Sequence, residues 1–335
     1  MSDKTTKKKR KKKKTKKKRL SKHRLNPIAE GELHKAVHKL SKEWAEEEEV
    51  KTAAEKKKYY VSGLGPTKTP SEMECITTGF QEIDDVLTGE QDPKTGKIIP
   101  GTGKGFPRGR MVEIFGPEAA AKTTLALCVI AQAQQKGELC AFIDVEQALD
   151  INYVERVIGV DVQGMFYKQP DSGDHALALA EHYVKKGVSV VVVDSVSALS
   201  SLEELTGKRA LGDQARMMSK ACRKITSYLR PGGTLIIFIN QVRYKIGVMF
   251  GNPETTSGGN ALRFYASVRG RVRKEKVLKK GGEVIGHRIE MEVKKNKVGP
   301  QHRKVKFDVK YNKGISIPKL RGKKKRSTDD ADLDE

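Results

Sequence analysis

The sequence is poor in cysteine, paired histidine and long apolar runs, and each shortage excludes a class of protein. Only 4 cysteines occur in 335 residues, at positions 75, 128, 140 and 222. They show no C-x-x-C spacing, so buried reduced thiols are expected rather than a disulfide framework or a metal site. The 7 histidines form no H-x-x-H or H-E-x-x-H pair, which argues against a catalytic zinc. No apolar run reaches about 18 residues and no apolar core of a signal peptide follows the start, so neither a membrane span nor a signal peptide is expected.

Positive charge is in excess, because 66 Lys and Arg outnumber 42 Asp and Glu and give a net charge of +24. Much of that charge lies in Lys7–Arg19 (KKKRKKKKTKKKR). Such a block cannot fold, so residues 1–25 are predicted to be a disordered basic arm. Contact with a polyanion such as DNA, or an address signal, is the functional interpretation, and a solubilising tail is the plain alternative. At the other end, residues 318–335 run from basic to acidic and are also predicted to be disordered.

Residues 26–72 are predicted to form an N-terminal helical segment followed by a linker. Apolar residues recur at steps of three and four, at Leu33, Val37, Leu40 and Trp44. The stretch 63–71 (GLGPTKTPS) is rich in Gly and Pro, as a linker is.

Residues 73–317 are predicted to form the globular core, of the α/β class. Short apolar runs predict strands near 111–115, 139–144, 165–168, 188–194 and 234–240. Helical patterns alternate with them near 122–136, 150–158, 174–186 and 213–230. Fully apolar strands with helical crossovers predict a mostly parallel, twisted sheet with helices on both faces. After Arg263 the pattern becomes rich in strands, with Gly281-Gly282 as a turn.

Directly after the apolar run 111–115, residues 116–124 read GPEAAAKTT and a helical pattern follows. A strand, a Gly-led loop and a helix that opens on Lys-Thr predict a phosphate-binding loop. Lys122 is expected to reach the outer phosphates of ATP and Thr123 to hold Mg²⁺. The pattern G-x-x-x-x-G-K-[ST] has glycine where this chain has Ala121, and alanine costs about 1 kcal/mol there if φ is positive. On this motif alone, a plain strand–turn–helix corner stays open as the alternative.

Polar residues also follow three of the predicted strands. Asp194 ends one strand, as the acid of a Walker B motif does, although an aspartate at this place can also cap the next segment. Glu146 lies just past a second strand, where a carboxylate can activate an attacking water. Gln241 follows a third strand, and its amide is placed to sense the γ-phosphate. Because the carboxyl ends of parallel strands meet in one crevice, the three residues are predicted to share the nucleotide site.

The stretch Val242–Asn260 contains no predicted helix or strand. It combines four glycines with basic residues near its start and several apolar residues. A long loop of this kind in a compact domain is usually functional. Basic side chains on phosphates and apolar ones between bases would suit single-stranded nucleic acid; an ordinary flexible lid is the alternative.

Six blocks of the sequence closely resemble the bacterial and phage RecA recombinases, over about residues 73–316. They are ITTGFQEIDDVL (76–87), GRMVEIFGPE (109–118), AFIDVEQALD (141–150), VVVVDSVSAL (190–199), ARMMSKACRK (215–224) and FINQVRYKIGVMFGNPETTSGGNALRFYASVR (238–269). The resemblance implies a RecA-like P-loop ATPase core. A hexameric helicase on a related core would lack the last of these blocks.

The resemblance also implies roles at the nucleotide site, with ATP and Mg²⁺ as the ligands. Glu146 would activate water, Gln241 would couple the γ-phosphate to DNA, and Thr123 and Asp194 would hold the metal. Lys295 and Lys297 match lysines that reach the ATP of the neighbouring protomer, so they join Lys122 among the catalytic residues. The nucleotide-binding set is Gly116, Pro117, Glu118, Ala119, Ala120, Ala121, Lys122, Thr123, Thr124, Asp150, Tyr153 and Asp194, with Tyr153 stacking on the adenine.

For DNA, the resemblance implies two loops and one helical face. The first loop would lie near residues 203–213. The DNA-binding set is Arg216, Ser219, Arg223, Arg243, Tyr244, Lys245, Ile246, Gly258, Gly259, Asn260 and Arg273. Arginines and backbone N–H groups would hold phosphates, and Ile246 would wedge between base triplets.

The chain departs from the family pattern at several points. Ala121 replaces the loop glycine, which predicts altered ATP affinity or turnover. Glu290 and Glu292 stand where the family carries basic residues near its secondary, duplex-holding site, of which Arg273 and Lys274 remain. The family's separate C-terminal domain is expected to be missing, and the Lys-rich arm is a candidate to take over its DNA-gathering work. The N-terminal helix is one that could pack on a neighbouring protomer.

The sequence therefore predicts an ATP-dependent recombinase in the cytoplasm of a bacterial or phage-infected bacterial cell. It would form helical filaments on single-stranded DNA, pair them with homologous duplex DNA and exchange strands. Single-strand-binding or loader proteins are candidate partners. The alternative is a DNA filament or mediator protein that binds ATP but hydrolyses it poorly because of Ala121.

Overall fold

The computed structural model describes residues 32–50, 73–201, 212–244, 251 and 253–317. The predicted basic arm 1–25, the predicted linker 63–71 and the predicted tail 318–335 lie outside these residues. So do most of the predicted first DNA loop, Lys245 and Ile246. Among the described residues, no helix combines the length and the apolarity that a membrane crossing requires.

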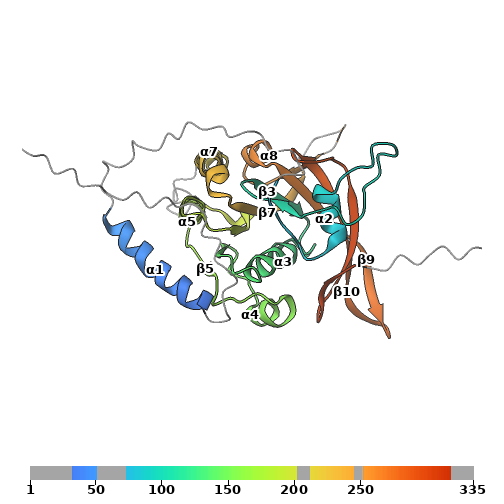
Figure 1. The fold of residues 1–335 in the computed structure, drawn as a ribbon, viewed down its shortest axis with the longest axis horizontal. Coiled ribbons are helices and arrows are strands. Elements are labelled where there is room, and N and C mark those ends of the chain that lie inside the picture. The colour runs from blue at the N-terminus through green and yellow to red at the C-terminus, as the bar shows by residue number, and fades with distance from the viewer. Residues whose placement is uncertain (1–31, 51–72, 202–211, 245–250, 252, 318–335) are drawn as a thin grey trace, which may run out of the picture.

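A large mixed sheet forms the centre of the molecule (Figure 1). Its strands follow the order β12-β11-β10-β9-β3-β7-β6-β4-β5, and β8 pairs with β7. The strands are β3 (Met111–Gly116), β4 (Cys140–Asp144), β5 (Phe166–Lys168), β6 (Val190–Asp194), β7 (Leu235–Tyr244), β8 (Glu254–Thr256), β9 (Val268–Lys280), β10 (Glu283–Asn296), β11 (Lys304–Lys310) and β12 (Gly314–Ser316). The run from β9 to β5 is parallel, whereas β9 to β12 are antiparallel neighbours.

Helices cover both faces of the parallel part, which confirms the predicted fold class. The helices are α1 (Glu32–Val50), α2 (Gln81–Thr88), α3 (Lys122–Gln134), α4 (Ile151–Tyr153), α5 (Gly173–Lys186), α7 (Asp213–Gly232) and α8 (Ala261–Tyr265). On one face, α2 and α3 pack on side chains such as Ile114 and Val192. On the other, α5 and α7 pack on side chains such as Val191 and Phe238. Because both faces are covered, the parallel strands are apolar at nearly every position.

Short elements complete the core. Strands β1 (Cys75–Ile76) and β2 (Phe106–Pro107) pair antiparallel and form a separate two-stranded sheet. A π-helix (Val154–Ile158) continues α4, and a 3₁₀ turn (Val196–Ala198) follows β6. Cys128, Cys140 and Cys222 are buried free thiols, and Cys75 is half-buried.

The long hairpin β9–β10 extends from the body of the molecule (Figure 1). Its turn is Gly281-Gly282, as predicted, and both glycines have positive φ angles of 60° and 89°. These angles lie in the left-handed region, where glycine avoids the cost of a side chain.

The prediction that Val242–Asn260 contains no regular element is wrong at both ends. Strand β7 continues to Tyr244 and forms a hairpin with β8, in which Arg243 lies opposite Thr255. Alternating burial could not reveal this strand, because its last residues are exposed and leave the core.

Helix α1 packs against its own chain. Leu33 and Val37 are buried, and the Trp44 ring stacks on Phe166 of β5 with centroids 5.1 Å apart. The His34 ring contacts the Asp161 carboxylate. The apolar stripe read from the sequence is therefore the face that meets the core.

Candidate nucleotide site and nucleic-acid interface

The phosphate loop connects β3 to α3 and adopts the conformation that its motif requires. Ala121 has φ 62° and ψ 26°, in the left-handed region, and Ala119 has φ 52°. The structure thus places alanine where the motif favours glycine, at a cost of about 1 kcal/mol. At Gly116 the need is steric, because a Cβ would lie 2.1 Å from the Val272 carbonyl oxygen.

Lys122 opens α3 with its ammonium group turned back over the loop. Its Nζ donates to the Pro117 carbonyl at 2.7 Å. Burial lowers the pKa of Lys122, and the nearby charges of Asp194, Glu146 and Glu118 act in the opposite direction. A buried ammonium beside the first turn of a helix is well placed for the outer phosphates of a nucleotide.

Thr123 and Asp194 meet across the site. The Thr123 hydroxyl donates to Asp194 Oδ2 at 2.6 Å. Burial raises the pKa of Asp194 to about 6, and the charges of Glu146 and Asp144 add to that effect. A hydroxyl and a carboxylate are hard oxygen ligands of the kind that Mg²⁺ prefers, so this donor set fits the metal. A bound Mg²⁺ would neutralise the charge that burial opposes.

We expect Asp194→Asn to stabilise the ligand-free protein at pH 7. A carboxyl with a raised pKa binds protons more tightly in the folded state, so its charge lowers stability as pH rises from about 4 through about 6. The difference between 3.8 and about 6 corresponds to at most about 3 kcal/mol. Urea unfolding with EDTA should show the gain at pH 7 and little difference near pH 4. A less stable variant at pH 7 would contradict this reading.

Glu146 lies at the opening of the site with two side-chain partners. The Ser195 hydroxyl donates to Glu146 Oε1, and Gln241 Nε2 donates to the same oxygen at 3.4 Å. Ser195 also contacts the Ser197 hydroxyl at 2.6 Å. Residues just after β4 and β6 and a residue within β7 therefore converge on one carboxylate, close to the arrangement that the strand-end prediction requires.

A cavity of about 580 Å³ lies over these residues. Of the predicted nucleotide-site residues, its wall contains Glu118, Ala119, Ala120, Ala121, Lys122, Thr123, Thr124, Glu146, Tyr153, Asp194 and Gln241. Asp150 is absent from the wall. It caps the start of α4, where its Oδ1 accepts the Tyr153 N–H at 3.1 Å.

One wall of the cavity was missed by sequence reasoning. It consists of Lys274, His287, Ile289, Val309 and Tyr311, from β9, β10, β11 and the residue that follows β11. Tyr311 is 56% exposed, and its ring meets the His287 ring edge-on, with centroids 5.9 Å apart. The sequence shows only an aromatic residue at the end of a strand-rich stretch. Its spacing does not connect it to the phosphate loop, so its place in the cavity could not be predicted.

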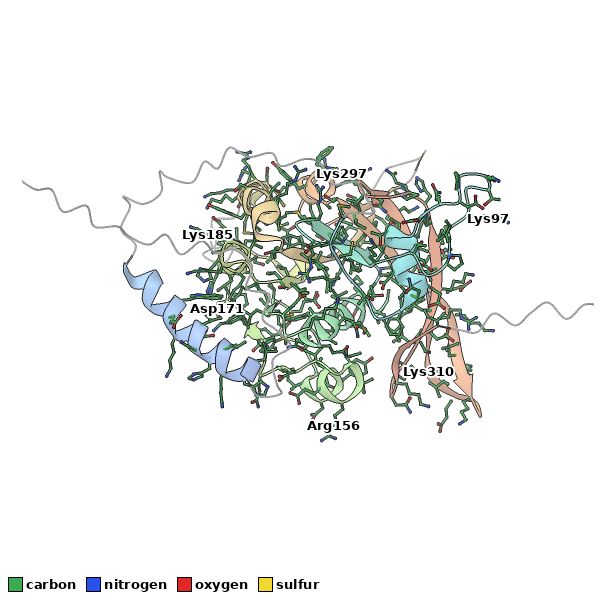
Figure 2. All side chains as sticks on the ribbon, viewed as in Figure 1. Lys97, Arg156, Asp171, Lys185, Lys297 and Lys310 are labelled. Atoms are coloured by element: carbon green, nitrogen blue, oxygen red, sulfur yellow. The ribbon has the colours of Figure 1, made fainter. Side chains whose placement is uncertain are left out.

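Lys295 and Lys297 lie away from this cavity. Figure 2 shows Lys297 at the end of the molecule that carries α8, opposite Arg156 beside α4. Lys295 Nζ donates to the Arg263 carbonyl at 2.7 Å, and Lys297 Nζ donates to the Phe264 carbonyl at 3.3 Å. Burial lowers the pKa of Lys295 to about 8, and the charge of Lys297 adds to this. Neither ammonium can serve the nucleotide of its own chain from this position.

The described DNA-binding candidates fall on α7, on the end of β7 and on the segment before α8. Arg216 and Arg223 are exposed on α7, with Ser219 half-buried on the same face. Arg243 and Tyr244 are exposed at the end of β7. Gly258 is buried, whereas Gly259 and Asn260 are exposed.

The predicted acidic departures form ion pairs on one face of β9, β10 and β11. Glu290 lies opposite Arg273 and Lys306, and Arg273 Nη2 donates to Glu290 Oε1 at 2.7 Å. Glu292 pairs with Lys294 at 2.9 Å. Lys274 lies on the other side of the strand, in the wall of the nucleotide cavity. The ion pair with Glu290 thus reduces the positive charge that Arg273 can offer to a phosphate.

The chain is similar to known proteins of one family. The model of the RecA N-terminal domain family matches residues 68–316. Protein RecA of Mannheimia haemolytica is 48% identical over 257 residues, which cover 76% of this chain and 66% of that protein. Protein RecA of Thioalkalivibrio sulfidiphilus is 47% identical over 260 residues, with 76% and 71% covered. The chain thus spans about two thirds of the length of these relatives.

Among solved structures, the RadB recombinase matches with a TM-score of 0.49 and 19% identity, over 64% of this chain and 93% of that one. The family model covers most of the chain, and both RecA proteins are nearly half identical to it over three quarters of its length. On the family model and the two RecA proteins, the chain belongs to the RecA family.

Proposed function

We propose that this chain binds ATP with Mg²⁺, forms a helical filament on single-stranded DNA, pairs it with homologous duplex and exchanges strands. The observation that carries the proposal is the path of β7. One strand places Gln241 against Glu146 in the nucleotide cavity and exposes Arg243 and Tyr244 two and three residues later. A candidate nucleotide sensor and a candidate DNA contact therefore share one strand.

The chemistry follows from the position of each side chain. Lys122 and the loop N–H groups would bind the phosphates, and Glu146 would hold and deprotonate the water that attacks in line. Thr123 and Asp194 would hold Mg²⁺, which supplies charge neutralisation when it is bound. Gln241, already bonded to Glu146, would exchange this partner for the γ-phosphate.

Lys295 and Lys297 would act on the ATP of an adjacent protomer. Their ammonium groups lie outside the cavity of their own chain, and within the described part of the chain they donate to carbonyl oxygens of residues 263 and 264. This arrangement supports a filament as the active species, with hydrolysis at the interface between protomers. Such a filament would act in the bacterial cytoplasm, with single-strand-binding or loader proteins as candidate partners.

Electron microscopy and an ATPase assay test the proposal together. Protein mixed with single-stranded DNA, Mg²⁺ and a non-hydrolysable ATP analogue should give regular filaments. The same DNA should stimulate ATP turnover. Absence of filaments with and without nucleotide would refute the proposal.

We expect Arg243→Ala to weaken binding of single-stranded DNA by about tenfold, because one charge-assisted contact to phosphate is lost. Nucleotide affinity of the DNA-free protein should not change, since Arg243 does not line the cavity. Fluorescence anisotropy with a labelled oligonucleotide measures the first quantity. Arg156→Ala, an exposed arginine beside α4 (Figure 2), is the matched control and should bind DNA as the wild type does.

Ala121→Gly separates the recombinase from the hydrolysis-poor alternative, which the family relatives do not favour. The Ala121 backbone already has φ 62°, so glycine should leave the loop unchanged. We expect turnover within about threefold of wild type and a gain in stability of at most about 1 kcal/mol. A silent wild type whose activity appears in the glycine variant would support the mediator instead.

A further inference from the structure

Two side-chain amides fix the backbone of Ser257 and Gly258, just before Asn260. Asn240 on β7 is fully buried and donates to the Ser257 carbonyl at 3.0 Å. Its own Oδ1 accepts the Gln241 N–H at 2.9 Å. On the other side, Gln214 of α7 accepts the Gly258 N–H at 3.1 Å.

The second amide also reaches the segment that follows the predicted metal ligand Asp194. Gln214 Nε2 donates to the Val196 carbonyl at 2.9 Å and to the Leu199 carbonyl at 3.0 Å. Val196 is one residue beyond Ser195, whose hydroxyl contacts Glu146. One neutral side chain thus connects the nucleotide site to Gly258.

Packing at the same place is tight. A Cβ on Gly258 would lie 2.8 Å from Val196 Cγ1, and a Cβ on Gly259 would lie 2.7 Å from the Ala215 Cβ. The two glycines have φ angles of 81° and 72°. The glycine backbone therefore lies directly on the 3₁₀ turn and on the first turn of α7. Because packed contacts of this kind do not deform smoothly, a shift of the turn must move the glycines.

We propose that Gln214 is a positioning residue that transmits the nucleotide state to the DNA-contacting segment 257–260, an inference that rests on the proposed function. A γ-phosphate beside Glu146 changes the partners of Ser195, and Gln214 carries the resulting shift of Val196 to Gly258. The same movement reorients the first turn of α7, on which Arg216 lies. The affinity for DNA then depends on the nucleotide through this amide.

The test compares Gln214→Leu with Gln134→Leu. Gln134, on α3, also exchanges two hydrogen bonds with backbone: its Nε2 donates to the Asp161 carbonyl at 2.7 Å and its Oε1 accepts the Asp161 N–H at 2.9 Å. The dissociation constant of a labelled oligo-dT is measured with Mg²⁺ and either a non-hydrolysable ATP analogue or ADP. The coupling is the dissociation constant measured with ADP divided by the one measured with the ATP analogue. Gln214→Leu should lower that ratio by about tenfold, and Gln134→Leu should keep it within about twofold.

Gln214→Glu provides a second variant for the case that leucine perturbs folding. The carboxylate keeps an acceptor for the Gly258 N–H but loses the donor to Val196 and Leu199, so the ratio should fall here too. Nucleotide affinity without DNA should stay at the wild-type value in both variants. An unchanged ratio, or an equal loss of DNA affinity with both nucleotides, would overturn the inference alone. A wild type that binds oligo-dT equally with both nucleotides, or with neither, would remove the proposed function as well.

Discussion

Glu146→Gln is expected to slow DNA-stimulated ATP hydrolysis by about two to four orders of magnitude, with nucleotide affinity almost unchanged. The amide has nearly the shape of the carboxylate, so it can keep the hydrogen bond to Ser195. It cannot take a proton from water. Because ATP would persist in the site, filaments on single-stranded DNA should outlast those of the wild type. Single-turnover hydrolysis and the rate of filament disassembly measure the two effects.

Glu118→Gln is the control for charge. Glu118 and Glu146 both act on Lys122 through their charge, and both line the cavity, but Glu118 belongs to the phosphate loop rather than to a strand end. Loss of a negative charge alone should alter turnover in the two variants alike. A hydrolysis rate for Glu146→Gln close to that for Glu118→Gln would remove Glu146 from the role of general base.

Arg269→Ala is expected to destabilise the fold by about 3–5 kcal/mol, because it leaves a buried carboxylate without its cationic partner and with only the neutral Asn240 amide donating to it among the described residues. Glu113 on β3 is 0% exposed and pairs with Arg269 on β9. The Arg269 guanidinium also lies over the Phe115 ring, 4.4 Å from its centroid. Urea unfolding monitored by circular dichroism gives the free energy of unfolding.

Arg273→Ala tests the same residue type on the same strand. Arg273 also pairs with a glutamate, Glu290. The arginine side chain is 49% exposed and the glutamate side chain 8% exposed, so water screens this pair in part, and its loss should cost about 1–2 kcal/mol, less than the loss of Arg269. The double variant Glu113→Leu/Arg269→Leu should be more stable than Arg269→Ala, since no unpaired charge is buried. Equal costs for the two arginine variants would show that burial of Glu113 has no energetic weight.

The parts of the fold that depend on local pattern could be predicted from the sequence. Strand β6 and helix α5 agree with their predicted ranges within a few residues, because burial on both faces produces unbroken apolar strands and amphipathic helices. The phosphate loop could be located because its motif requires residues close together in the chain. The positive φ at Ala121 follows from the same motif.

Contacts between distant segments could not be predicted. Tyr311 and His287 enter the nucleotide cavity only because β10 and β11 extend the sheet antiparallel beyond β9. Gln214 looks like an ordinary polar residue in a helix, and its three backbone partners come from two other segments: Val196 and Leu199 from the turn after β6, and Gly258 from the segment before α8. Periodicity reports which face is buried and says nothing of which segment covers it.

The packing of α1 has a consequence for solubility. In the described sheet β5 is the last strand, so one of its backbone edges is open to pairing with another chain. Trp44 of α1 covers Phe166 of that strand and lies near Tyr183. If α1 were cleaved off, two aromatic rings would be uncovered beside an unpaired strand, a combination that favours aggregation. By covering these rings, α1 reduces the tendency of the sheet edge to aggregate with other chains.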